Sequence, residues 1–287
     1  MAILVIFMVI SLFENTNLFA KPAPAVIDPD ALIIRMLDVG QADAFLLTQG
    51  DAAMLIDCGN PGDEERLLPA LSSYGVEKLD TFILTHPHTD HIGGAAGLLK
   101  AIPVEKIVVP GQAWDAGHYA ALSTAIADAG ASVYRTTPGD VYPLGDASFT
   151  ILSPGEETDI SDLNNASVCL RIGYAGRYAL FTGDAGSAVE QQLLDSGAEL
   201  RADILKASHH GSDTANSSDW LTAVDPSFIF ISCREDSESD DLPAAEALSR
   251  LEATGASILR SDLHGVVTIV IDSRGKITVI SERNALT

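Results

Sequence analysis

Three of the chain's seven histidines fall within the stretch THPHTDHIGG, residues 85–94. Neutral imidazole and carboxylate are the ligands that Zn²⁺ and similar ions prefer. Because alternate side chains of an extended loop point the same way, His86 and His88 can hold one ion together. Asp90 and His91 follow directly and can reach a second ion. The spacing HxHxDH therefore predicts a metal-binding loop rather than a chance cluster of polar residues.

Two later segments offer partners for this loop. Asp184, in FTGDAG, follows a predicted buried strand and could bridge two ions, although an N-cap of the next helix fits the same pattern. His209 and His210, in LKASHHGS, follow another predicted strand. Because adjacent histidines point apart, we expect one to bind metal and the other to face the substrate or a hydrogen-bond acceptor. Which of the two is the ligand stays open.

Composition and charge limit the classes of partner. The chain has 287 residues, 47% of them hydrophobic, which is enough for a sizeable core. With 40 acidic against 17 basic residues, its formal net charge is −23. A surface of this charge repels nucleic acid at long range, so we expect no tight binding to duplex DNA. The three cysteines are widely spaced and indicate no disulfide framework.

The first 28 residues resemble a targeting segment rather than part of the fold. An apolar run from Ile3 to Phe13 precedes small residues around Ala20 and Ala23, as in a signal peptide, although no Lys or Arg comes before it. An uncleaved anchor and a misassigned start are the alternatives. We therefore predict a leader or anchor over 1–28 and one hydrolase domain over 29–287. We also predict a secreted or cell-surface location and no stable membrane span in the mature chain.

Short apolar runs alternate with amphipathic stretches from Ala31 onward. Hairpins are predicted over 43–59, 131–154, 167–184 and 265–280, and further strands over 31–38, 78–85, 106–110, 202–208, 227–233 and 257–261. Helices are predicted over 63–75, 93–102, 118–130, 185–197 and 243–255. The pattern favours an α/β fold in which two mixed sheets pack together and helices cover their outer faces.

Seven segments together carry a resemblance to a known family. They are LDVGQADAFLL, LIDCG, THPHTDHIGG, NNASVCLRI, LFTGD, LKASHHGS and RSDLHGVVTI, in this order. The chain resembles the metallo-β-lactamase-fold hydrolases, and more narrowly the branch typified by the hydrolase domain of the competence protein ComEC/Rec2. The resemblance covers residues 31–281. It implies an αββα four-layer sandwich with two divalent ions at one edge of the sheets, usually zinc, with manganese as the alternative.

The resemblance also implies a set of metal ligands and supporting carboxylates. The ligands matched by motif are His86 and His88 for the first ion, Asp90, His91 and His210 (or His209) for the second, and Asp184 as the bridge. Asp90 would also orient the attacking water. Asp43 and Asp57, at the ends of early strands, are placed to accept hydrogen bonds from ligating histidines, with a turn or capping role as the alternative.

Five further residues match motif positions near the family's site. Lys206 and His264 are predicted to contact an anionic oxygen, the alternatives being a solvated strand end and an ordinary turn residue. Asn164, Asn165 and Ser167 match the NNxS segment of the branch and are predicted to contact the substrate, whereas Asn-Asn is otherwise a turn signal.

Two departures from the family bear on the site and its substrate. Many members outside this branch have another ligating histidine between the HxHxDH loop and the bridging aspartate. Here the only histidine in that interval is His118, which we interpret as a surface helix residue, so the first ion is expected to have fewer protein ligands. The segment CREDSESDDLP, residues 233–243, is acidic and lacks histidine, and beside the site it would disfavour long polyanions.

The sequence favours an exported metal-dependent hydrolase of phosphodiesters, either small ones or single-stranded nucleic acid. Within the same fold, hydrolysis of a lactam, lactone or thioester carbonyl is the alternative. A catalytically weak metal-binding or partner-binding module is the alternative of another class, supported by the missing histidine. The sequence assigns no oligomeric state.

Overall fold

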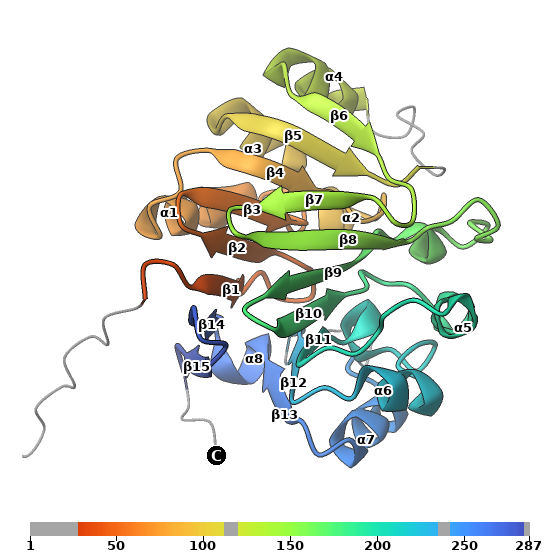
Figure 1. The fold of residues 1–287 in the computed structure, drawn as a ribbon. Helices are drawn as coiled ribbons and strands as arrows, with labels where there is room; N and C mark the ends of the chain where they lie inside the picture. Colours follow the sequence, from red (N-terminus) through yellow and green to blue (C-terminus); the bar gives the residue numbers. More distant parts are fainter. Residues whose placement is uncertain (1–27, 112–119, 235–241, 284–287) are drawn as a thin grey trace, which may run out of the picture.

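Two β-sheets stack face to face in the computed structural model, which describes residues 28–111, 120–234 and 242–283 (Figure 1). The first sheet has the strand order β15-β14-β1-β2-β3-β4-β5-β6, and the second has the order β13-β12-β11-β10-β9-β8-β7. The first sheet contains β1 (Leu32–Met36), β2 (Phe45–Gln49), β3 (Ala52–Ile56), β4 (Leu79–Ile83), β5 (Val104–Val109), β6 (Ser132–Arg135), β14 (Val267–Ile271) and β15 (Ile277–Ser281). The second contains β7 (Val141–Leu144), β8 (Ala147–Ser153), β9 (Cys169–Tyr174), β10 (Arg177–Phe181), β11 (Ile204–Lys206), β12 (Phe228–Ile231) and β13 (Ser257–Arg260).

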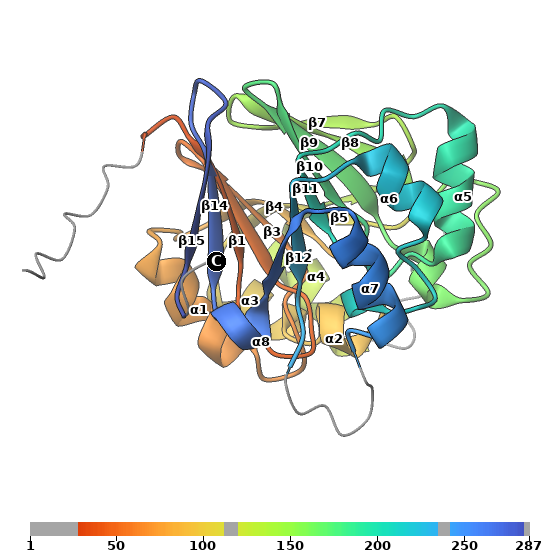
Figure 2. The same ribbon diagram turned by 90° about the horizontal axis from the view of Figure 1, so that it is seen from below.

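Helices cover the outer face of each sheet (Figures 1 and 2). The first sheet is covered by α1 (Glu64–Ser73), α3 (Ala95–Ala101) and α4 (Ala120–Ala129), and the second by α5 (Ser187–Ser196), α6 (Ser218–Val224) and α7 (Ala245–Ala253). The short helices α2 (Thr89–Ile92) and α8 (Ser261–His264) and the 3₁₀ turns η2 (Leu163–Ala166) and η3 (Ser208–Gly211) lie in the connections.

Three hydrophobic layers hold the sheets and helices together. Between the sheets, the ring of Phe45 packs edge-on against Phe181 and Phe230, with ring centroids 5.3 and 5.6 Å apart. Outside the first sheet, side chains of α1 and α3 such as Leu67 and Leu98 are buried against it. A third layer, with α5, α6 and α7, lies outside the second sheet. Four layers of structure enclose these three cores, so the predicted αββα arrangement is confirmed.

Most of the predicted hairpins are confirmed. The strand pairs β2-β3, β9-β10 and β14-β15 are antiparallel, as the sequence indicates. The predicted hairpin over 131–154 is confirmed only in its second part, where β7 and β8 pair antiparallel in the second sheet. Its first part is wrong, because β6 pairs parallel with β5 in the first sheet. The segment between β6 and β7 therefore changes sheet. A Pro-Gly turn signal has the same composition whether the chain folds back or crosses to another layer.

Both sheets place the predicted site residues at one edge. In the first sheet β3 to β6 run parallel, and in the second β10 to β13 do so. The carboxyl ends of these strands lead directly into Asp57 after β3, His86 after β4, Asp184 after β10 and His209 after β11. Figure 2 shows α2 and α8 at the same end of the two sheets. Loops at the carboxyl ends of parallel strands are where such folds bind ligands.

Part of what the sequence predicts lies outside the described residues. This holds for the leader over 1–28 apart from Asp28, for His118, and for residues 235–241 of the acidic segment. Within the ranges that the structure describes, no helix combines the length and apolar character needed to cross a membrane. The division into a leader and one hydrolase domain stays a prediction.

Candidate metal centre

The HxHxDH segment runs from the end of β4 into α2. We find that its two following glycines serve close packing, since Gly93 has an ordinary helical φ of −59° and Gly94 one of −79°. A Cβ at Gly93 would lie 2.3 Å from the backbone nitrogen of Pro61, and one at Gly94 would lie 2.6 Å from the carbonyl oxygen of Cys58. The loop after β4 thus presses against the loop after β3, and this contact places the histidines beside Asp57.

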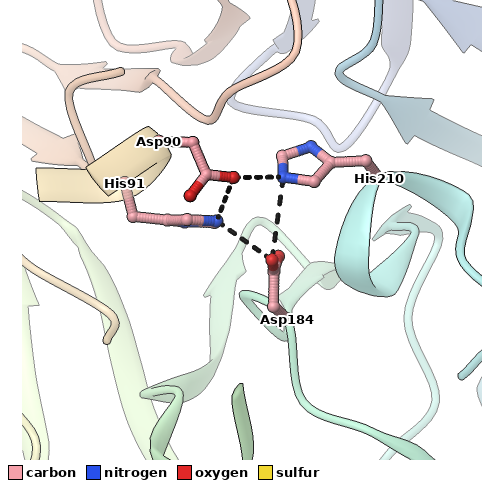
Figure 3. Close-up of side chains that lie close together, drawn as sticks. All are labelled: Asp90, His91, Asp184 and His210. Atoms are coloured by element: carbon pink, nitrogen blue, oxygen red, sulfur yellow. Dashed lines mark hydrogen bonds and ion pairs between the residues drawn. The ribbon is translucent and has the colours of Figure 1, made fainter. Parts of the chain in front are cut away.

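Four side chains converge from three loops: Asp90, His91, Asp184 and His210 (Figure 3). Their ligand atoms all lie within 4.8 Å of one another. The shortest distances are 3.1 Å from His91 Nε2 to Asp184 Oδ2 and 3.2 Å from His210 Nε2 to Asp90 Oδ2. His91 Nε2 is buried and has no hydrogen-bond partner within the described residues. Carboxylate oxygens of Asp184 and Asp90 lie 3.1 and 3.6 Å from this atom, and a divalent ion held by two imidazoles and two carboxylates would bind between them.

His86 and His88 lie beside this set. His86 Nε2 is 3.1 Å from His88 Nδ1 and 3.9 Å from Asp184 Oδ2. An ion with bonds of about 2.0–2.2 Å joins ligand atoms up to roughly 4 Å apart, so these distances suit the first ion, expected at His86 and His88. Asp184 Oδ2 is common to both groups of ligands. Asp90, His91, Asp184 and His210 would hold one divalent ion, called the second ion, and His86, His88 and Asp184 would hold the first.

Asp57 fixes the orientation of His91. Its Oδ2 accepts hydrogen bonds from His91 Nδ1 at 2.7 Å and from the Thr85 hydroxyl at 2.6 Å, and its Oδ1 accepts one from the Thr85 backbone N–H at 2.8 Å. A proton held on Nδ1 leaves the Nε2 lone pair for a metal. Asp57 has a φ of 57°, which is uncommon for residues other than glycine. Asp57 thus accepts a hydrogen bond from His91, one of the candidate ligands.

His210 has a different support, which the sequence did not indicate. Its Nδ1 lies 2.9 Å from the carbonyl oxygen of Ser232, just after β12. The Ser232 hydroxyl donates to Asp43 Oδ1, whereas His210 Nδ1 is 3.6 Å from the same oxygen. Asp43 therefore acts on His210 through Ser232 and not through the direct hydrogen bond we expected. The only sequence signal for Ser232 is its place at the end of an apolar strand.

Lys206 is buried behind the ligands. Its ammonium group lies 2.6 Å from Asp43 Oδ2, 2.7 Å from the carbonyl oxygen of Gly183 and 3.3 Å from Asp184 Oδ1. A lysine has three N–H donors, and these three acceptors use them all. With 1% of its surface exposed, Lys206 makes no contact of the kind predicted with an anionic substrate. It holds Asp184 Oδ1 instead, so that Oδ2 faces the histidines.

The NNxS segment also lies behind the ligands. The buried Ser167 hydroxyl accepts a hydrogen bond from the Asp184 backbone N–H at 2.9 Å and lies 3.3 Å from His86 Nδ1. Asn165 Oδ1 accepts one from the Gly186 N–H at 3.1 Å. Ser167 and Asn165 thus support the loop of Asp184, which differs from the substrate contact we expected. Asn164 Oδ1 is buried and has no hydrogen-bond partner in the described part of the chain.

The structure does not bring His264 to the metal ligands. Its Nδ1 accepts a hydrogen bond from the Arg260 backbone N–H at 3.0 Å, within the turn that contains α8. No hydrogen bond, ion pair or ring contact joins His264 to the converging side chains of the described residues. The predicted contact with an anionic oxygen therefore has no support in the geometry.

The prediction that His209 and His210 point apart is wrong. Both adopt the left-handed conformation, with φ and ψ of 51° and 50° at His209 and 53° and 24° at His210. Successive residues of a strand face opposite sides, whereas at this left-handed turn both imidazoles lie near Asp184. His209 Nε2 lies 3.8 Å and His210 Nε2 3.7 Å from Asp184 Oδ2. Such a conformation costs on the order of 1–3 kcal/mol per residue and is typical of functional sites.

Charge within the cluster prepares its carboxylates for metal binding. Burial raises the pKa of Asp90, but the hydrogen bond with His210 and the charge of His91 outweigh it, and the pKa lies well below its usual range. Burial likewise raises the pKa of Asp184, but the charges of His91 and His210 hold it well below its usual value. Burial lowers the pKa of His86, which favours neutral imidazole. Burial also lowers the pKa of His91 and of His210, but the charges of Asp184 and of one further aspartate each outweigh it, and both pKa values are raised. Because neutral imidazole is the form that binds metal, a bound ion would displace a proton from each of these two histidines.

The protein has an αββα fold, with two mixed sheets and outer helices. Its His/Asp cluster at one edge of the sheets is a candidate dinuclear metal centre. Residues 37–230 match the family described as the Metallo-beta-lactamase superfamily, and the chain belongs to that superfamily. Family membership supports a hydrolase that uses divalent metal ions. The family expected from the sequence motifs is confirmed.

The chain is similar to competence proteins. It is 29% identical over 252 residues to ComE operon protein 3 of Bacillus subtilis (strain 168), a match that covers 82% of this chain and 32% of the relative. It is 28% identical over 251 residues to competence protein ComA of Neisseria gonorrhoeae, a match that covers 87% of this chain and 34% of the relative. The chain thus spans about a third of the length of these relatives. The predicted resemblance to the ComEC/Rec2 branch is confirmed.

Two further similarities concern other members of the superfamily. The chain is 27% identical over 231 residues to a hydroxyacylglutathione hydrolase of Acidiphilium cryptum (strain JF-5), with 75% of this chain and 79% of the relative covered. The structure of the metallo-beta-lactamase fold protein YhfI from Bacillus subtilis superposes with a TM-score of 0.55 at 14% identity, covering 82% of this chain and 98% of YhfI. At this identity the likeness to YhfI supports the fold alone.

Proposed function

We propose that this chain hydrolyses phosphodiesters with two divalent metal ions held by its His/Asp cluster. The observation that carries the proposal is the convergence of Asp90, His91, Asp184 and His210, with His86 and His88 beside them. When bound, two divalent ions lower the pKa of a water and stabilise negative charge on a phosphoryl oxygen. The phosphodiester is the substrate class expected from the motifs that resemble the ComEC/Rec2 branch, and the similarity to competence proteins supports that branch.

The chain's own residues would orient the attacking water and hold the metal ions. The side chain of Asp90 is 30% exposed, whereas those of His91, Asp184 and His210 are at most 2% exposed. His209 is similarly exposed, at 28%, so the substrate reaches the cluster on the side of Asp90 and His209. The ionised Asp90 there can accept a hydrogen bond from the attacking water and orient it. Asp90, Asp184 and the imidazoles hold the ions, and Lys206 fixes Asp184 from behind.

Charge narrows the class of phosphodiester. The site residues include four carboxylates, Asp43, Asp57, Asp90 and Asp184, against one buried ammonium, Lys206. An anionic substrate is repelled by this arrangement unless bound cations reverse the local charge. With a net charge of −23, the chain also lacks the basic surface that duplex DNA requires. We therefore propose a small phosphodiester or a single strand that enters at the metal centre.

The test uses bis-p-nitrophenyl phosphate and a single-stranded oligonucleotide, each with and without a chelator. We expect turnover that is lost on chelation and restored by zinc or manganese. Asp90→Ala should lower kcat by at least about 10²-fold, because it removes a proposed metal ligand and the carboxylate that orients the water. Asp219→Ala, which changes an exposed aspartate of α6, is the matched control. Two bound ions without phosphodiester turnover would refute the proposal and favour a metal-binding or partner-binding module.

A second candidate is hydrolysis of a carbonyl substrate, favoured by the similarity to hydroxyacylglutathione hydrolases. The same cluster can stabilise the oxyanion of a thioester, lactone or lactam. The assay for it compares a glutathione thioester and a lactone with bis-p-nitrophenyl phosphate at equal enzyme concentration. A larger kcat/KM on either carbonyl substrate would replace the phosphodiester proposal by this one.

We also propose that residues 1–28 direct export to the cell surface or beyond. The apolar run followed by small residues supports this part. Mass spectrometry of the chain recovered from an expressing bacterium gives the test. We expect a mature chain that starts after one of the small residues near Ala20 or Ala23, or full-length chain in the membrane fraction. Full-length chain in the cytoplasmic fraction would contradict export.

A further inference from the structure

His209 is the one side chain of the converging loops that neither the phosphodiester proposal nor the family match requires. Its Nε2 lies 3.8 Å from Asp184 Oδ2, the oxygen that the two groups of ligands share. Its Nδ1 lies 3.4 Å from the hydroxyl of Thr214. A ligating histidine commonly has one nitrogen toward the metal and the other on a hydrogen-bond partner. His209 shows this arrangement.

His209 and His210 approach Asp184 Oδ2 with different neighbours. His210 Nε2 is 3.2 Å from Asp90 Oδ2, which places it in the set with His91. His209 is not a member of that set, and no ion pair or hydrogen bond joins it to Asp90 within the described residues. The two imidazoles therefore serve different parts of the cluster. The second ion already has four protein ligands, whereas the set with His86 and His88 has three, counting the shared carboxylate.

We propose that His209 Nε2 is the fourth protein ligand of the first ion, together with His86, His88 and Asp184. This inference rests on the two-ion site of the proposed function. The distances of His86 and His209 to Asp184 Oδ2 are 3.9 and 3.8 Å, within the roughly 4 Å that one ion with bonds of about 2.0–2.2 Å can join. A histidine from the loop after β11 thus takes the place of the ligand that the interval between His91 and Asp184 was expected to supply.

The loop after β11 is built to hold both histidines in their left-handed conformation. Asn216 is fully buried, and its side chain accepts a hydrogen bond from the Ser208 N–H at 2.9 Å and donates to the carbonyl oxygens of Ser208 and Ser212 at 3.0 and 3.2 Å. The buried Glu190 accepts hydrogen bonds from the Asn216 N–H at 2.6 Å and the Ser217 N–H at 3.0 Å. This network gives the turn one shape, with both imidazoles on the side of Asp184.

The test counts bound metal rather than turnover. His209→Asn removes the imidazole, and Asn is among the residues that best tolerate the left-handed region, so the loop keeps its shape. Metal per chain is measured by mass spectrometry after dialysis, and the binding of Co²⁺ is followed by its visible absorption. We expect the unchanged chain to bind two ions. His209→Asn should keep one ion unchanged and bind the other at least about tenfold more weakly.

Matched variants separate this role from others. His264→Asn changes a histidine that lies apart from the cluster, and His118→Asn changes the remaining histidine of the chain. We expect both to bind two ions as before, and Thr214→Val to weaken one ion by less than His209→Asn does. Two ions of unchanged affinity in His209→Asn, or loss of one ion in His118→Asn, would overturn the proposal. Metal binding is measured without any substrate, so failure of the phosphodiester assay would not refute the proposal for His209.

Discussion

The two histidine-bearing loops of the site reach the same carboxylate by different means. The loop after β4 has its four candidate ligands within six residues, and Asp57 and Thr85 support it from the neighbouring loop and from its own first position. The loop after β11 has only two histidines, each in the left-handed conformation, and its supports come from Glu190, Asn216 and Ser232.

The two loops differ in whether neighbouring residues or distant segments of the chain place their histidines. In the first loop, alternation along an extended segment brings His86 and His88 together, and α2 presents Asp90 and His91. In the second, ordinary backbone angles would turn one histidine away, so contacts remote in the chain must hold the left-handed pair. Three substitutions test this difference. One acts on both loops, one on the first loop and one on the second.

The largest effect is expected where the two loops meet. Asp184→Asn removes the negative charge of the carboxylate whose Oδ2 lies within 3.9 Å of four imidazole nitrogens. Loss of the shared ligand should weaken both ions and lower kcat/KM by on the order of 10³-fold. Metal content and bis-p-nitrophenyl phosphate turnover are measured on the same sample. Retention of two ions with full turnover would show that the loops act without a common carboxylate.

A smaller effect is expected from the support of the first loop. Asp57→Asn replaces the charged acceptor of His91 Nδ1 but keeps the size of the side chain. Because it acts on one ligand, it should weaken the second ion by about 10- to 100-fold and leave the first ion nearly unchanged. Co²⁺ titration of the variant beside His209→Asn measures both ions. Equal weakening of the two ions in Asp57→Asn would contradict the division of ligands.

The smallest effect is expected from the support of the second loop. Asn216→Ala removes the side-chain hydrogen bonds to Ser208 and Ser212, which should lower the free energy of unfolding by about 1–3 kcal/mol. Asn216 has a φ of 59°, so Asn216→Gly, which tolerates this angle, should lose less. Urea unfolding of the metal-free variants compares them. If alanine and glycine gave equal stability, the left-handed backbone at position 216 would not be under strain.

Much of the fold and the centre of the site could be predicted from the sequence. Apolar alternation identified β2, β3, β9 and β10, and the HxHxDH spacing identified His86, His88, Asp90 and His91 as neighbours. The switch of β6 and β7 to different sheets could not be predicted, because turn residues do not specify the layer to which the chain returns.

The side chains around the centre were harder to assign. Lys206 and Ser167 match motif positions, and sequence alone placed them against the substrate. The structure buries both behind the ligands, because β11 ends beneath Asp184 and the start of β9 lies beside it. The sequence does not identify Ser232 and Asn216 as supports of the site, because serine and asparagine are common in turns. Only the folded chain brings Ser232 to His210 and Asn216 to Ser208.

By itself the sequence determined which residue types could bind metal and that they follow buried strands, because spacing and apolar pattern are local properties of the chain. Only the tertiary structure decided which oxygen of Asp184 faces the histidines, since Lys206 occupies the other one. It also decided that His209 and His210 face the same carboxylate. These outcomes depend on backbone angles and burial that contacts between distant segments impose, and no short stretch of sequence contains those contacts.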